Sequence, residues 1–187
     1  MGKLIVSEFV SIDGVMEAPG GEEGYAHTGW VLRAFDQEWL DHKQAELMAF
    51  ESHLLGRKTY ESFAGAWPDR DGPMAEKINA MPKYVASSTL KKLDWNNSHL
   101  LIGDTAAAVS LLKAENVGDI LVAGSHTLLQ TLKANNLIDE YRMMVFPVVL
   151  GSGMKMFDET PERMELALIG TEVFKCGVVE MRWGRKG

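Results

Sequence analysis

Short apolar runs alternate with stretches of helical periodicity along most of this 187-residue chain. A near-continuous apolar run bounded by turn residues is typical of a strand that is covered on both faces. Such runs predict strands at residues 3–10, 54–55, 83–87, 99–102, 120–123 and 137–146. Because helical patterns stand between most of these runs, the sequence predicts an α/β domain.

Apolar residues at helical spacing predict helices at 30–50, from 59 onward, at 74–81, from 104 or 105 to 113, and up to 134. Asp36 is a candidate N-cap within the first of these helical patterns. Two β-favouring segments, 166–175 and 178–183, flank Cys176 and Gly177, which together predict a hairpin.

The first candidate binding feature lies where the strand at 54–55 turns into a helix. Gly56 ends the apolar run, and Arg57, Lys58 and Thr59 follow it. The first N–H groups of a helix lack intrahelical acceptors, and the helix dipole adds partial positive charge there. This arrangement favours a bound phosphate. The alternative is an ordinary strand-to-helix turn with two solvated cations.

The strand at 120–123 repeats this design. It runs into Gly124, Ser125 and Thr127, after which an amphipathic pattern begins. Two anion-binding turns in one small α/β domain fit a dinucleotide better than a mononucleotide. The glycine fingerprint of the Rossmann fold is absent after the first strand.

A third polar turn follows the strand at 83–87. Ser87, Ser88 and Thr89 place hydroxyl groups there, and Lys91 and Lys92 come just after them. Hydroxyls and cations at a strand end suit a further phosphate, and a capped turn without a ligand is the alternative.

Residues 15–29 form a long glycine-rich loop behind the turn at Asp13 and Gly14. Loops of this length in compact domains tend to be functional or disordered. This loop therefore has two alternative interpretations, a lid over an active site and a disordered surface insertion. Gly14 permits a positive φ or a close approach of the backbone to a ligand.

The composition indicates a globular protein, with 46% hydrophobic and 24% charged residues. The net charge of −7 and the absence of a basic block make nucleic acid an unexpected partner. No apolar run is long enough to span a bilayer, and the first residues lack a signal peptide. The single cysteine, Cys176, fits a reducing compartment, so we expect a cytoplasmic protein.

A metal site is not expected. His42 and Glu46 lie four residues apart, but no further ligand pair has suitable spacing. A metal-dependent hydrolase that uses His27, His42, His53, Asp36 and Glu46 is the weakest of the functions considered.

Several segments in this order resemble the dihydrofolate reductase-like family, in the branch similar to the reductase domain of bacterial riboflavin biosynthesis (the RibD C-terminal domain). The segments that carry the resemblance are 11–14, 54–61, 122–125, 128–129, 137–141 and 147–153, with Phe157. The resemblance covers nearly the whole chain and implies a single domain over residues 1–187. It also implies a mixed, mostly parallel central sheet flanked by helices, with a C-terminal antiparallel hairpin.

The resemblance further implies an NADPH cofactor and a homodimer. By position, Gly56, Arg57, Lys58 and Thr59 look like the first phosphate-binding turn. Ser87 and Ser88 look like the turn that holds the adenosine 2′-phosphate, and Gly124, Ser125 and Thr127 look like the pyrophosphate turn. Ala123 stands where the dihydrofolate reductases carry the first of two glycines. Ser11 to Gly14 and the following loop resemble the segment that closes over the nicotinamide.

These expectations lead to an NADPH-dependent oxidoreductase that passes hydride to a C=N or C=O carbon of a small substrate, such as a pterin-like or pyrimidine-like molecule. Asp13, Tyr25 and Asp36 are the candidate groups near the proton donor. Asp41 and Arg33 lie where related enzymes contact their substrates, but neither identifies a substrate here. A non-catalytic NADP(H)-binding protein with a sensing or scaffold role is the alternative.

Overall fold

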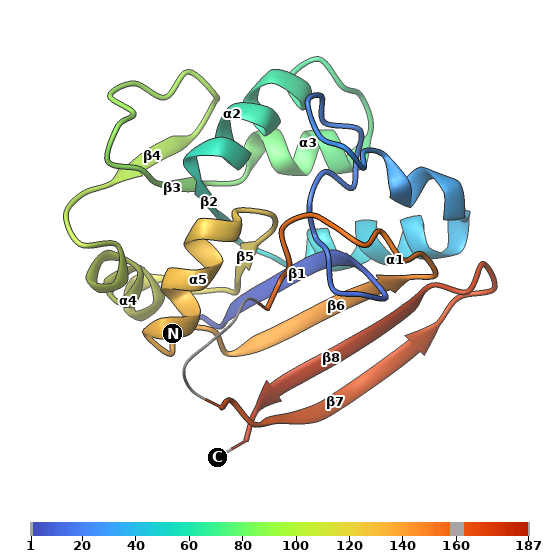
Figure 1. The fold of residues 1–187 in the computed structure, drawn as a ribbon. Coiled ribbons are helices and arrows are strands. Elements are labelled where there is room, and N and C mark those ends of the chain that lie inside the picture. The colour runs from blue at the N-terminus through green and yellow to red at the C-terminus, as the bar shows by residue number, and fades with distance from the viewer. Residues whose placement is uncertain (1, 158–162, 187) are drawn as a thin grey trace. The chain divides into compact units, whose positions relative to one another are not determined.

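The computed structural model describes residues 2–157 and 163–186, and Figure 1 shows how its elements follow one another. The strands are β1 (Leu4–Ser11), β2 (Ser52–Gly56), β3 (Lys83–Ala86), β4 (Ser98–Leu101), β5 (Ile120–Val122), β6 (Glu140–Phe146), β7 (Leu166–Val173) and β8 (Val179–Arg185). The helices are the 3₁₀ helix η1 (Trp30–Ala34) and α1 (Gln37–Met48), α2 (Arg57–Ala66), α3 (Pro73–Ala80), α4 (Thr105–Glu115) and α5 (His126–Ala134).

The strands form one mixed sheet in the order β4-β3-β2-β5-β1-β6-β8-β7. The pairs β1–β5, β2–β5, β2–β3 and β3–β4 are parallel. The pairs β6–β8 and β7–β8 are antiparallel. The predicted fold class, a mostly parallel sheet with a C-terminal antiparallel hairpin, is therefore confirmed.

The chain divides into two compact units. The first unit consists of the residues up to Val6 together with His42–Ile138, and the second consists of Ser7–Asp41 and the chain from Asp139 onward. β1 contributes its first three residues to the first unit and the rest to the second. The expectation of one domain stays a prediction.

The first unit has its own apolar core beneath α2 and α3. Alternate residues of the parallel strands point to this side, so Leu55 of β2 and Val85 of β3 are fully buried together. Tyr60 of α2 and Ile78 of α3 pack against them, and Trp95 completes the cluster.

The core of the second unit is rich in aromatic side chains. The ring of Phe146 lies 5.4 Å from Phe9, 5.5 Å from Trp30 and 5.6 Å from Trp39. All three pairs meet edge to face, the arrangement that the aromatic quadrupole favours. The indole N–H groups of Trp30 and Trp39 each donate to a backbone carbonyl, so neither polar group is buried without a partner.

The prediction of one helical stretch over residues 30–50 needs a correction. Phe35 has an extended backbone, with φ −63° and ψ 130°, and it separates η1 from α1. The Asp36 carboxylate accepts the N–H of Glu38 at 2.9 Å, which makes Asp36 the predicted cap of α1. The apolar spacing runs across the break because both helices bury residues in the same aromatic cluster.

Candidate functional site

The predicted cofactor turns of the first unit lie at one edge of its parallel strands. Gly56 ends β2, and its partner in the register is Ala86, the last residue of β3. β5 lies on the other side of β2 and ends at Val122, just before Gly124. Because these strands are parallel and adjacent, the three turns that follow them come together at their carboxyl ends, where ligands bind in open α/β sheets.

The two glycine turns interlock. The N–H of Gly56 donates to the Ser125 hydroxyl at 2.8 Å. Gly124 has a φ of +67°, and a Cβ at this position would lie 2.9 Å from the Thr59 side chain. Only glycine fits both this backbone conformation and this contact. The expected adjacency of the two turns is therefore present.

Ser125 has a left-handed backbone, with φ 68° and ψ 50°, which is uncommon for a residue other than glycine. Its hydroxyl is held by the Gly56 N–H, so this contact helps to fix the backbone conformation. Two consecutive left-handed residues, Gly124 and Ser125, direct the chain from β5 into α5.

The helices that start at these turns are not capped by side chains. Gly56, the N-cap of α2, and Ser125, the N-cap of α5, make no capping hydrogen bond to their own helix through a side chain. By contrast, Asp104 caps α4 by accepting the Ala107 N–H at 2.9 Å. A helix N-terminus without such a cap is suited to binding an anion.

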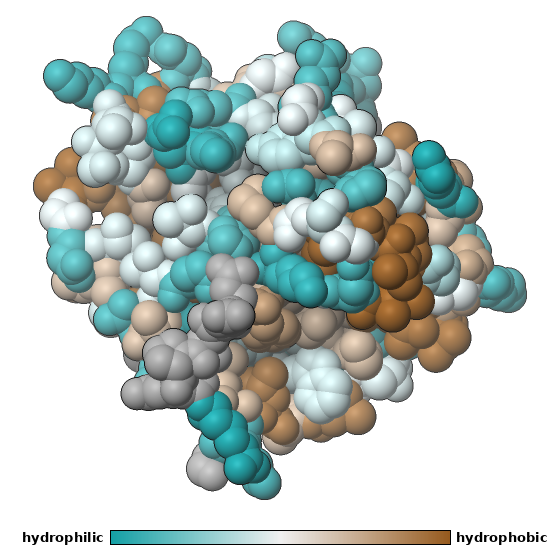
Figure 2. Space-filling view, in the orientation of Figure 1, coloured by the Kyte–Doolittle hydropathy of each residue, from teal (hydrophilic) through white to brown (hydrophobic). Residues whose placement is uncertain are grey.

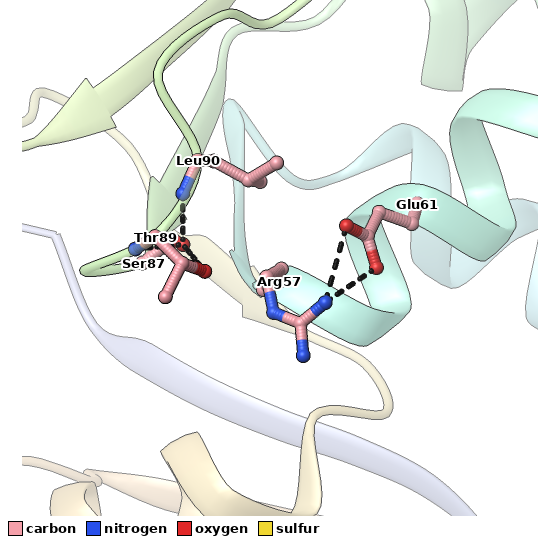
Figure 3. Close-up of polar contacts among 5 residues, drawn as sticks. All are labelled: Arg57, Glu61, Ser87, Thr89 and Leu90. Carbon is pink, nitrogen blue, oxygen red and sulfur yellow. Dashed lines mark hydrogen bonds and ion pairs between the residues drawn. The ribbon is translucent and has the colours of Figure 1, made fainter.

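Cationic side chains flank this edge. Arg57 and Lys58 are exposed on the first turn of α2. The Arg57 guanidinium contacts the Glu61 carboxylate at 3.1 Å across one helical turn, and both side chains are almost half exposed (Figure 3). Such an exposed pair contributes little to stability, so Arg57 can exchange this partner for a phosphate at small cost.

The turn after β3 is organised by the Ser87 hydroxyl. It accepts the N–H groups of Thr89 at 3.2 Å and Leu90 at 3.0 Å (Figure 3). Ser88 and Thr89 are exposed on this turn. Ser87 therefore shapes the turn, while the side chains of Ser88 and Thr89 are exposed on it and the Thr89 hydroxyl lies 3.4 Å from that of Ser87. Sequence reasoning included all three hydroxyls as candidates for a phosphate, and the resemblance implied Ser87 and Ser88 for the adenosine 2′-phosphate.

In the second unit, the Asp13 carboxylate ties two loops together. It accepts the Ser11 hydroxyl at 2.7 Å, the N–H of Leu150 at 3.1 Å and the N–H of Gly151 at 2.8 Å. These bonds, with the Ser11 hydroxyl the largest cause, lower the pKa of Asp13 to about 2. Residues 147–153 were singled out only as part of the family resemblance, and nothing in the sequence indicated that the N–H groups of Leu150 and Gly151 bind Asp13.

Asp13→Ala should loosen this loop connection, because two backbone N–H groups and the Ser11 hydroxyl would lose their acceptor. We expect the free energy of unfolding to fall by about 1–2 kcal/mol, measured by urea denaturation. Asp94→Ala, which removes an exposed ion pair with Lys92, should change it little. An Asp13→Ala protein as stable as the wild type would contradict this assignment.

The other second-unit candidates have different surroundings. Gly14 has a φ of +83° and open space where a Cβ would lie. Tyr25 is half-buried in the loop over 15–29. Asp36 uses one oxygen to cap α1, and Asp41 accepts a hydrogen bond from Gln37 at 2.7 Å. The carboxylates of Asp36 and Asp41 therefore have local structural partners. The assignment of Asp13, Tyr25 and Asp36 as groups near a proton donor stays a prediction.

The loop over 15–29 has defined contacts within the second unit. Val15 forms a bridge with Lys155, and the N–H of Met16 donates to the Met154 carbonyl at 2.9 Å. The Thr28 hydroxyl donates to the carbonyl of Glu22 at 2.7 Å. The loop is thus anchored at its start and closed on itself near its end.

Among the described residues, no group of three or more histidine, cysteine, aspartate or glutamate side chains could hold a metal ion. Of the histidines considered for a metal, His27 contacts the Ser152 hydroxyl and His53 is fully buried in β2. In the same part of the chain, no helix has the length and apolarity needed to cross a membrane.

The sheet order, the C-terminal hairpin and the turns at the strand ends define a protein with a dihydrofolate reductase-like fold. The model of the RibD C-terminal domain family matches residues 2–180. The chain belongs to that family.

Two relatives come from Bacillus subtilis (strain 168). The "Uncharacterized protein YyaP" is 29% identical over 185 residues, which cover 96% of this chain and 93% of that protein. The "Uncharacterized protein YwjB" is 28% identical over 145 residues, 73% of this chain and 80% of that protein.

Two crystal structures share the fold. A "Putative riboflavin biosynthesis protein" from Shewanella sp. PV-4 has a TM-score of 0.77 at 21% identity, covering 99% of each chain. A "pyrimidine reductase-like protein" from Corynebacterium diphtheriae has a TM-score of 0.66 at 11% identity, covering all of this chain and 92% of that one. At these identities the likeness concerns the fold.

Proposed function

We propose that the protein is an NADPH-dependent reductase. The observation that carries this proposal is the pair of interlocked turns in the first unit, which place two helix N-termini without side-chain caps beside each other. Membership of the RibD C-terminal domain family and the fold shared with a pyrimidine reductase-like protein support it.

The residues present fit a diphosphate-bearing cofactor. Because residue 124 is glycine, the Thr59 side chain packs directly against the backbone of this turn, which lets the two turns approach each other closely. In the proposal, the first N–H groups of α2 and α5 bind the diphosphate, together with Arg57 and Lys58. Ser88 and Thr89, on the turn that Ser87 organises, bind the adenosine 2′-phosphate.

Reduced nicotinamide, when bound, supplies a hydride for a C=N or C=O carbon of a small substrate, such as a pterin-like or pyrimidine-like molecule. The protein's own part is to bind, orient and exclude water. The proton comes from a carboxylic acid or an ordered water. Because the pKa of Asp13 is lowered, we assign that side chain to holding its loop rather than to delivering a proton.

NADPH titration tests the cofactor part of the proposal. We expect saturable binding, and we expect Gly124→Ala to weaken it at least about tenfold, because the new methyl group displaces Thr59 from the turn. Gly103→Ala is the matched control. Gly103 also has a positive φ, precedes the cap of α4, and has open space around a Cβ. Absence of saturable NADPH binding would remove the proposal.

Turnover separates a reductase from the alternative, a non-catalytic NADP(H)-binding protein. NADPH oxidation should be followed against pterins, pyrimidines, quinones and carbonyl compounds. Oxidation with one of these classes supports the reductase. Binding of NADPH without turnover on any of them favours a sensing or scaffold role. A cytoplasmic location stays a prediction.

A further inference from the structure

The first unit contains a cavity of about 360 Å³ at the end of its strands that lies opposite the cofactor turns. The cavity is lined by Ala64, Pro68, Asn79, Asp94, Trp95 and Asn96. These residues belong to the C-terminal parts of α2 and α3, the loop after α2 and the segment before β4. The cofactor turns, in contrast, follow the carboxyl ends of β2, β3 and β5. A cavity of this volume is large enough for a small-molecule ligand.

Hydrogen bonds hold the walls of this cavity together. The Asn79 side chain accepts the indole N–H of Trp95 at 2.7 Å and donates to the Trp67 carbonyl at 3.0 Å. The backbone N–H of Trp95 donates to the buried Tyr60 hydroxyl at 3.0 Å. The Asn96 amide donates to the Asn79 carbonyl at 3.2 Å. Because α2, α3 and the segment before β4 are tied in this way, a ligand would find the cavity already formed.

Part of the lining is apolar. Ala64 and Pro68 have no polar atoms in their side chains, and Trp95 has only an indole N–H, which Asn79 accepts. In Figure 2, teal and white side chains prevail over α2 and α3, so the surface around these helices is largely polar. A small apolar wall in polar surroundings fits one flat ring, whereas a protein partner needs about 800 Å² of contact surface.

The charges narrow the class of ligand. Asp94 is the one charged residue among the six described residues that line the cavity, so an anionic ligand would meet no opposite charge there. A cation is disfavoured as well, because the buried Lys83 ammonium group already lies 4.4 Å from the centre of the Trp95 ring. These charges favour an uncharged ligand.

The polar groups of the lining favour a ligand with N–H donors. The Asp94 carboxylate accepts hydrogen bonds only, and Asn96 has a side-chain oxygen besides the amide group that binds Asn79. Asp94 pairs with Lys92, but both side chains are exposed, so this ion pair can be exchanged at small cost. An amino group beside a ring N–H presents two parallel donors, which match the two oxygens of a carboxylate.

We propose that this cavity binds a small uncharged nitrogen heterocycle that carries an amino group beside a ring N–H, as a guanine base does. The ring lies against Ala64 and Pro68, and the two donors bind the Asp94 carboxylate. The proposal concerns a second binding site, remote from the cofactor turns, and it does not depend on the proposed reductase activity.

Titration with guanosine by calorimetry tests this proposal. We expect saturable binding to the wild type. Inosine, which lacks the amino group, should bind at least about tenfold more weakly, because one donor to Asp94 is missing. Asp94→Asn should weaken guanosine binding at least about tenfold and remove the difference between guanosine and inosine. Asp94 is exposed, so this variant should fold, which circular dichroism checks.

Asp71→Asn is the matched control, because Asp71 is an exposed carboxylate of the first unit outside the lining. It should leave guanosine binding unchanged, and so should saturating NADPH. Competition between NADPH and guanosine would assign guanosine to the cofactor turns and overturn the proposal. Absence of saturable guanosine binding would also overturn it, as would equal affinity of the wild type for guanosine and inosine.

Discussion

Replacing His53 with leucine should remove most of the loss in the free energy of unfolding that this residue causes as the pH falls. His53 lies on β2, fully buried, and its ring lies 5.9 Å from that of Phe63. Neither ring nitrogen has a hydrogen-bond partner among the described residues. Burial, with the nearby charge of Lys83 as a second cause, lowers the pKa of His53 to about 3.

The direction of the effect follows from proton uptake. The folded protein keeps His53 neutral down to about pH 3, whereas the unfolded chain binds a proton near pH 6.5. Between these values the unfolded state holds more protons, so stability is greatest above pH 6.5 and falls as the pH drops. The expected slope is about 1.4 kcal/mol for each pH unit, or about 2 kcal/mol lost at pH 5.

Urea denaturation at several pH values between 7.5 and 4.5 measures this effect. The difference in unfolding free energy between His53→Leu and the wild type should grow in favour of the variant as the pH falls. His99→Leu, which removes an exposed histidine on β4, should follow the wild-type curve. If the free energy of unfolding changed with pH in the same way for His53→Leu and the wild type, the burial of His53 would not affect the pH dependence of stability.

The strands of the first unit were predictable because they consist almost entirely of apolar residues. The fully buried residues of β2 and β5, such as Leu54, Leu55 and Ile120, need apolar neighbours on both faces, and that leaves a continuous apolar run. The turn residues were equally informative. Gly124 is glycine because its backbone and its contact with Thr59 permit nothing larger.

Other features depend on contacts that are distant in sequence. Nothing near Asp13 indicates that its acceptors are satisfied by the N–H groups of Leu150 and Gly151, more than 130 residues away. The break at Phe35 was hidden because apolar spacing reports the buried side and not backbone continuity.

In the candidate site, too, some features follow from the local sequence and others depend on the folded backbone. The positions of the phosphate turns follow from local strand–glycine–helix patterns, which the chain carries within a few residues. The roles within a turn do not. Ser87 and Ser88 look equivalent in sequence, yet the Ser87 hydroxyl accepts two N–H groups of its own turn while Ser88 is exposed. Only the backbone path determines which hydroxyl can meet a ligand.

Lys83→Met should destabilise the first unit by about 2–4 kcal/mol, because it leaves buried carbonyl groups without a donor. Lys83 is fully buried on β3, beside His53 in the register. Its ammonium group donates to the carbonyls of Ile78 at 2.8 Å, Asn79 at 2.9 Å and Met81 at 2.8 Å.

These three carbonyls lie at the C-terminal end of α3, where a helix lacks donors and its dipole is negative. The ammonium group also lies 4.4 Å from the centre of the Trp95 ring, a favourable cation–π distance. Burial lowers the pKa of Lys83 to about 8, so the charged form still predominates at pH 7. Three donors for three acceptors explain why a lysine is buried here.

Urea denaturation at pH 7 compares Lys83→Met with Lys92→Met as the matched control. Lys92 is 82% exposed and pairs with exposed Asp94, so its loss should change the free energy of unfolding by less than about 0.5 kcal/mol. Methionine keeps the apolar length of Lys83, and a loss in that variant therefore reports the missing donors rather than a cavity. If Lys83→Met were as stable as Lys92→Met, the ammonium group would not be what holds the end of α3.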